Sequence, residues 1–101
     1  MPKGYWIVRM DVRDPEKYKE YAVANAVAFK KYGARFLVRG GKFEKLEGGS
    51  RGRNVVIEFP SYQAALDCWN SSEYKKALAI RQPISEGDII IIEGYDGPQP
   101  S

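Results

Sequence analysis

Four consecutive isoleucines occupy residues 89–92, and this run constrains the fold more than any other feature of the chain. Side chains alternate between the two faces of a strand, so the run places two isoleucines on each face. It is far too short to cross a bilayer as a helix, which takes about 20 apolar residues. A sheet containing this strand therefore needs apolar cover on both faces.

The rest of the apolar pattern predicts three further strands and three helical segments. Strands are predicted at residues 5–12, 34–39, 53–59 and 89–95. The helical segments span about residues 15–32, 62–69 and 73–82. Asp14, Ser61 and Ser72 are the expected N-caps, and Gly40 with Gly41 suggests a bulge at the end of the second strand.

This order of elements is typical of a ferredoxin-like βαββαβ fold of the α+β class. It predicts a four-stranded antiparallel sheet with its helices on one face. The length of 101 residues fits one domain, which we place at residues 1–96, with a flexible C-terminal tail at residues 97–101.

The face without helices should be polar in a monomer, and it is not. Tyr5 and Ile7 oppose Trp6 and Val8 on the first strand, and two of the four isoleucines point the same way. An apolar patch of this size marks an interface. We therefore expect a homodimer in which two sheets pack face to face, as in a dimeric α+β barrel.

Two residue counts exclude several kinds of chemistry. The chain has no histidine and a single cysteine, Cys68. A Ser-His-Asp triad, a Cys-His pair and His-ligated zinc or haem are therefore impossible. We predict no metal and no cofactor, and we interpret Cys68 as a packing residue off the inner helix face. No targeting or membrane-spanning segment is visible, so a cytoplasmic location is expected.

The positive charge is concentrated in the middle of the chain. Residues 30–53 hold eight basic and two acidic side chains, whereas the whole chain has a net charge of +3. The excess fits either an anionic ligand or a solvated hairpin. An RNA-recognition module would need stacking aromatics after Arg51-Gly52, and Arg53 and Asn54 follow instead. Nucleic acid is therefore not an expected partner.

Several segments together resemble domain-of-unknown-function family 1330 of the dimeric α+β barrel superfamily. The resemblance covers nearly the whole chain and is carried by the segments YWIV at 5–8, DPEKY at 14–18, FLVRGG at 36–41, VIEFP at 56–60 and EGD at 86–88. It implies the fold and the dimer but no agreed activity. Related architectures include cofactor-free monooxygenases, small isomerases and haem-degrading enzymes. The haem-degrading enzymes use a helix histidine that this chain lacks.

The candidate ligand-binding residues are polar or aromatic side chains on inward helix faces: Tyr21, Asn25, Trp69, Tyr74 and Arg81. Asn25 and Arg81 interrupt apolar stripes, and the aromatic residues offer flat walls. Together they predict a pocket between helices and sheet for a small carboxylate-bearing or aromatic molecule. The resemblance implies a cofactor-free enzyme, such as a monooxygenase or an isomerase, as one function for such a pocket. The alternatives are a core asparagine, a solvent-reaching or salt-bridged arginine, and a non-catalytic structural or binding dimer.

Overall fold

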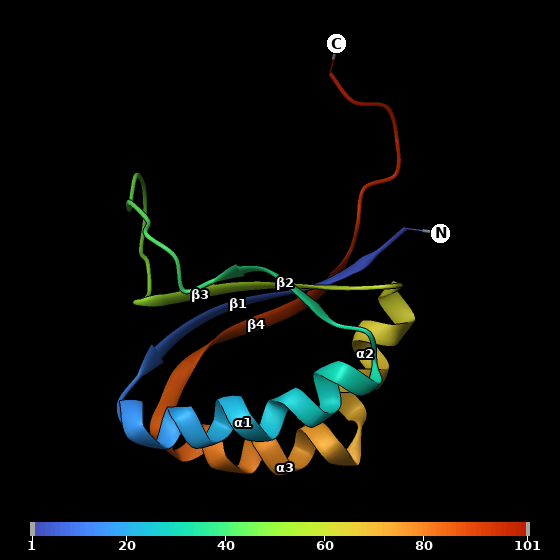
Figure 1. Ribbon diagram of the computed structural model, residues 1–101. Coiled ribbons are helices and arrows are strands. Elements are labelled where there is room, and N and C mark those ends of the chain that lie inside the picture. Colours follow the sequence, from blue (N-terminus) through green and yellow to red (C-terminus); the bar gives the residue numbers. More distant parts are fainter. Residues whose placement is uncertain (1, 101) are drawn as a thin grey trace.

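The computed structural model describes residues 2–100 and confirms the predicted fold class and order of elements (Figure 1). The strands are β1 (Gly4–Val12), β2 (Arg35–Arg39), β3 (Arg53–Phe59) and β4 (Ser85–Glu93). The helices are α1 (Pro15–Lys31), α2 (Tyr62–Asn70) and α3 (Ser72–Arg81), and the 3-10 turn η1 (Gln82–Ile84) leads into β4. Of the predicted tail, residues 97–100 lie in no helix or strand, and residue 101 lies outside the described residues.

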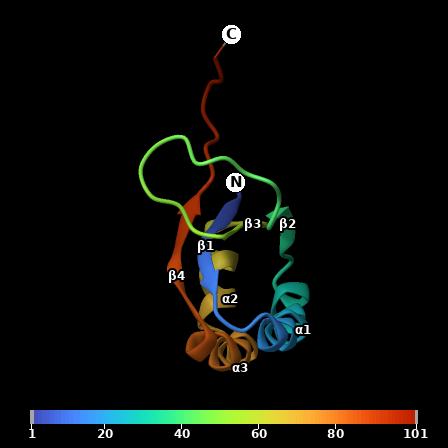
Figure 2. The ribbon, with the colours of Figure 1, turned by 90° about the vertical axis from the view of Figure 1, so that its left-hand side faces the viewer.

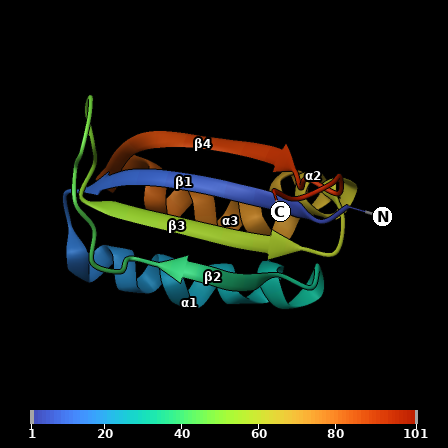
Figure 3. The ribbon, with the colours of Figure 1, turned by 90° about the horizontal axis from the view of Figure 1, so that it is seen from above.

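One antiparallel sheet carries all four strands in the order β2-β3-β1-β4 (Figure 3). The helices lie together on one side of it, which we call the inner face, and α1 and α3 run side by side (Figures 1 and 2). The opposite side is the outer face. The loop at residues 40–52 and the C-terminal segment extend from the sheet on the outer side.

The helix ends follow from local capping. The Asp14 carboxylate accepts a hydrogen bond from the backbone N–H of Lys17 at 3.1 Å, and Gly33, with φ of +73°, takes the left-handed conformation after α1. The predicted cap at Ser72 is wrong by one residue. Ser71 caps α3, since its hydroxyl accepts from the N–H of Tyr74 at 3.1 Å. The Ser71 N–H still bonds to Cys68 at the end of α2, so this one residue joins both helices.

The bulge in β2 lies elsewhere than the glycines suggested. The register with β3 shifts between Phe36 and Val38. Phe36 opposes Ile57 on the inner face, whereas Val38 opposes Val56 on the outer face. The extra residue reverses the alternation, so Phe36 and Val38 lie on opposite faces of the sheet.

The core of the molecule is an aromatic cluster centred on Trp6 in β1. The ring centroids of Phe29, Phe59, Trp69 and Tyr74 lie 4.9–5.6 Å from that of Trp6. The indole N–H donates to the backbone carbonyl of Ala65 at 3.0 Å, so burying Trp6 leaves no donor unpaired. This cluster joins β1 to α1, α2 and α3 at one point.

Removing that point should destabilise the whole domain. We expect Trp6→Ala to lower the free energy of unfolding by about 3–5 kcal/mol, because it leaves a large cavity in the core. Val23 lies on the solvent-exposed side of α1 and is 75% exposed. The control Val23→Ala should change the free energy of unfolding by less than about 0.5 kcal/mol. Urea unfolding followed by circular dichroism measures both values, and equal values would contradict this account of the core.

Candidate functional site

A groove runs along the inner face between α1 and β3, and we call it the α1–β3 groove. It consists of two adjoining cavities of about 480 Å³ and 30 Å³, which share Tyr18, Ala22 and Arg53 as lining residues. The larger cavity lies beside the end of β1 and the start of α1. The smaller one extends toward Asn25 and Phe29. A volume of this order suits a small organic molecule, for which cavities of roughly 300–1,000 Å³ are usual.

Arg53 is the charged residue that both cavities share. Alternation along β3 puts Arg53 on the inner face with Val55 and Ile57. Its guanidinium lies over the Tyr18 ring, 5.1 Å from the ring centre, and its buried Nε has no hydrogen-bond partner. None of the carboxylates within residues 2–100 lies within 4 Å of Arg53. Asp11 and Lys19 also line the larger cavity, but Asp11 is paired with Arg51. Arg53 therefore has no carboxylate partner of its own.

Gly40 makes room for this guanidinium. A Cβ on Gly40 would come within 2.6 Å of Arg53 Nη1, and the φ of +68° at Gly40 is one that side chains rarely allow. Of the two glycines that suggested a bulge, Gly40 thus allows the close approach of Arg53.

The five predicted site residues do not meet in one cavity. Tyr21 and Asn25 line the smaller cavity of the groove, and Asn25 is only 6% exposed. Trp69 and Arg81 line a separate cavity of about 280 Å³ between α3 and β4. Tyr74 is fully buried between the two regions, with its hydroxyl 2.8 Å from that of Tyr21. The Tyr21–Tyr74 pair links the two cavities without opening one into the other.

The phenols of the groove stay protonated at neutral pH. Burial, and then the neighbouring Tyr74, raise the pKa of Tyr21, and Arg81 and Asn25 only partly oppose this. Burial also raises the pKa of Tyr18. A phenol with a raised pKa stays neutral, so it donates a hydrogen bond rather than removing a proton. The groove thus combines a guanidinium, an amide and neutral phenols.

The sequence reasoning did not select Arg53 or Arg39 as ligand residues. The regular alternation Arg53-Val55-Ile57 was a usable signal for Arg53. The bulge sets Arg39 opposite Val55. Its guanidinium stacks on the Phe36 ring, 4.1 Å from the ring centre, and lines the smaller cavity.

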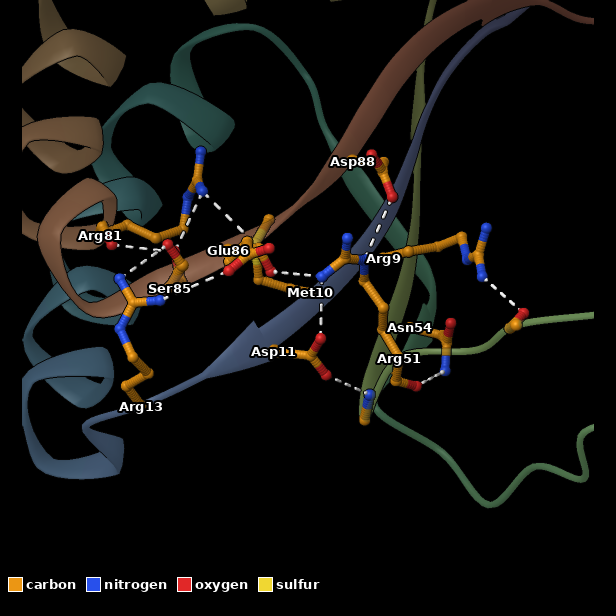
Figure 4. A network of polar contacts seen from close by, with 12 residues as sticks. Arg9, Met10, Asp11, Arg13, Arg51, Asn54, Arg81, Ser85, Glu86 and Asp88 are labelled. Atoms are coloured by element: carbon orange, nitrogen blue, oxygen red, sulfur yellow. Dashed lines mark hydrogen bonds and ion pairs between the residues drawn. The ribbon is translucent and has the colours of Figure 1, made fainter.

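A second group of charges lies on the outer face and is paired (Figure 4). Arg51 binds Asp11 at 2.8 Å and Asp88 at 3.1 Å, and the Gly52 N–H donates to Asp11 at 3.0 Å. The Gly52 N–H, and then Arg51, hold the pKa of Asp11 below its usual value. The network fastens the base of the 40–52 loop to β1 and β4. The two carboxylates thus pair with Arg51 and leave Arg53, two residues later, without a carboxylate partner.

Cys68 differs from the expectation that it lies off the inner helix face. It is completely buried in the core, because α2 turns this side toward the sheet. Burial raises the pKa of its thiol to about 12, and Glu73 adds to the shift. Across residues 2–100, no three histidine, cysteine or acidic side chains gather as metal ligands, and no helix is long and apolar enough to span a membrane.

The thiol of Cys68 should therefore resist alkylation in the native protein. At about pH 8 a thiol with a pKa near 12 is ionised in roughly one molecule in ten thousand. We expect iodoacetamide to leave the folded chain unmodified by mass spectrometry and to add one label in urea. Rapid labelling of the folded protein at that pH would contradict a buried, protonated thiol.

The fold and the groove together define a ferredoxin-like α+β protein with cavities between its helices and its sheet. Residues 3–95 match the model of the family described as a domain of unknown function, DUF1330, so the chain belongs to that family. This confirms the resemblance noted from the sequence. No curated protein matches the chain.

Solved structures share the fold at low sequence identity. RPA0582, a protein of unknown function from Rhodopseudomonas palustris, is 18% identical over 95% of this chain and 85% of its own, with a TM-score of 0.73. SnoaB, a cofactor-independent oxygenase from Streptomyces nogalater, is 8% identical over 96% and 97%, with a TM-score of 0.67. A dimeric ferredoxin-like protein of unknown function from Thermobifida fusca is 16% identical over 91% and 89%, with a TM-score of 0.59.

Proposed function

We propose that this protein is a homodimer that binds a small aromatic carboxylic acid in the α1–β3 groove. The observation that carries the proposal is Arg53, a guanidinium beside a cavity of about 480 Å³ with no carboxylate within 4 Å among the described residues. A planar guanidinium offers paired donors that match a carboxylate. An anionic ligand would supply the missing counter-charge.

The rest of the groove suits the remainder of such a molecule. In the larger cavity Tyr18 presents an aromatic face, and Met10 and Val12 provide apolar walls. Asn25, at the narrow end, offers both a donor and an acceptor. An apolar cavity with a few polar groups is the usual form of a small-molecule site. Tyr21 and Asn25 thereby keep the binding role expected from the sequence.

The outer face supports the homodimer. Val38, Val56, Ile7 and Ile90 oppose one another in turn and form a continuous aliphatic row across all four strands. Val38 is 43% exposed and Ile90 is 55% exposed in the single chain. A second copy of this face would cover the row. The Thermobifida fusca neighbour, which is described as dimeric, has the same fold.

A cofactor-free enzyme, such as an oxygenase or an isomerase, is the second candidate. The fold shared with the cofactor-independent oxygenase SnoaB favours it. The groove itself favours binding, because its phenols are held neutral and do not act as bases near pH 7. Oxygen uptake on adding a bound aromatic acid would support an oxygenase; binding without turnover would support the binding protein.

We also propose that the protein lies in the cytoplasm, where the free thiol of Cys68 suits a reducing environment.

Ligand-dependent thermal melting tests the groove. We expect benzoate or phenylacetate, but not their neutral amides, to raise the Tm of the wild type. Arg53→Met should weaken acid binding about 10- to 100-fold, because a hydrogen bond to a charged group is lost. Lys76 is an exposed lysine on α3, so Lys76→Met makes the same change in charge away from the groove and should bind normally. An equal loss of acid binding in both variants would show that the effect comes from the net charge of the protein and not from Arg53.

Asn25→Leu separates a binding asparagine from a structural one. The two side chains are close in volume, and leucine has no polar group to satisfy. If Asn25 contacts the ligand, the variant should keep or exceed the wild-type Tm and lose the shift caused by the acid. A variant that melts lower and still responds fully to the acid would show that Asn25 is structural.

Light scattering coupled to gel filtration tests the dimer. We expect a mass about twice the 11.4 kDa of the chain. Ile90→Glu should shift the protein toward the monomer, because it places a charge in the aliphatic row, at its β4 end. Val23→Glu makes the same kind of change on the exposed side of α1 and should leave the dimer intact. A wild-type monomer at micromolar concentration would overturn this part of the proposal.

A further inference from the structure

A second arginine, Arg81 in α3, is more deeply buried than Arg53 and has only neutral partners. It is 7% exposed. Nη1 donates to Ser85 Oγ at 3.4 Å and to the sulfur of Met10 at 3.6 Å, and Nη2 donates to the Tyr74 hydroxyl at 3.4 Å. All three contacts are long for hydrogen bonds, and the buried Nε has no partner. Figure 4 shows this guanidinium beside Met10 and Ser85.

No group in the described part of the chain balances this charge. Its six ion pairs involve other side chains, and none brings a carboxylate within 4 Å of Arg81. The Tyr21 ring lies 5.5 Å from the guanidinium, but burial raises the pKa of that phenol and keeps it neutral. Burying a guanidinium without a nearby anion is costly, because the charge loses its hydration and nothing of opposite sign compensates for it. The missing partner is therefore expected from outside the chain.

The space for that partner is the cavity of about 280 Å³ between α3 and β4. Arg81, Gln82 and Ser85 give it polar walls, and Trp69 closes one side. The Ser85 hydroxyl donates to the backbone carbonyl of Arg81 at 2.9 Å, which fixes the turn from α3 into β4 around the guanidinium. The polar lining suits a short, hydrophilic anion better than a hydrocarbon.

We propose that this cavity is a second binding site, and that it takes a short aliphatic carboxylate through Arg81. The site is separate from the α1–β3 groove, since Met10 is the only lining residue that it shares with either cavity of the groove. It also differs in ligand size, because its volume is a little over half that of the larger groove cavity. We therefore expect the two sites to respond to acids of different size.

Acetate is the probe, with chloride at the same ionic strength as the control for general salt effects. In a zwitterionic buffer, acetate should raise the Tm of the wild type above the value in chloride. Arg81→Met should melt at or above the wild type without acetate, because a buried unpaired charge has been replaced by an apolar group of similar length. The variant should show no acetate shift. An equal acetate shift in wild type and Arg81→Met would overturn the proposal.

Trp69 gives a second readout, in the wild-type protein, that does not depend on whether Arg81→Met folds. Because Trp69 lines the cavity, acetate should change the tryptophan fluorescence of the wild type saturably, and Trp69→Phe should remove the change. No saturable change with acetate would overturn the site. A response to phosphate but not acetate would also reject a carboxylate site.

Arg53→Met distinguishes this proposal from the groove. Arg53→Met should keep the full Tm shift with acetate and lose the Tm shift with benzoate. Arg81→Met should lose the shift with acetate and keep the shift with benzoate. Loss of both responses in either variant would show that the two cavities form a single site, which contradicts the second site while leaving ligand binding itself in place.

Discussion

Burial of Trp6 is the interaction on which the rest of the structure depends. Its ring is completely enclosed by side chains from α1, α2, α3 and β3, so every element over the inner face is positioned with respect to it. Aromatic rings are large and rigid, and they fill the layer beneath the centre of the sheet. The cavities remain where β1 extends beyond this cluster, on either side of Met10. The position of the core thus determines the position of both candidate sites.

Three arginines differ in their partners because they lie in different parts of the fold. Arg51 lies on the outer face, where Asp11 and Asp88 neutralise it. Arg53, two residues later in the chain, lies at the inner face without a carboxylate. Arg81 approaches the same layer from α3 and meets only a thioether and two hydroxyl groups. A structural role explains the first arginine, and for the other two we propose anion binding.

The outer and inner faces differ in the roles that we propose for them, assembly for the outer face and ligand recognition for the inner face. The aliphatic row through Ile7 and Val56 makes no use of polar chemistry, which suits an interface with a second copy. The polar groups of the inner face lie among aromatic rings, which suits a small ligand. Proteins that retain this fold at 8–19% identity have changed most of their side chains, so any activity must be argued from the groove and not from the shared architecture.

Much of the fold was determined by sequence pattern alone. The alternation in β1 and β3, the cap at Asp14 and the isoleucine run predicted the strands, the first helix and the two-faced sheet, because each depends on local spacing. Deviations arose where distant segments meet. The bulge after Phe36 is set by pairing with β3, and the start of β4 at Ser85 is set by pairing with the end of β1.

For the candidate site too, local sequence pattern determined some features and tertiary packing determined the others. The sequence by itself determined that Tyr21, Asn25, Tyr74 and Arg81 face inward, since helical periodicity is a local property. It could not determine that Arg81 lies in a different cavity from Asn25, or that Arg53 is unpaired while Arg51 is not. Those outcomes depend on which side chains from α1, α3 and the strands approach within a few ångströms, and only the packing of the helices on the sheet decides that.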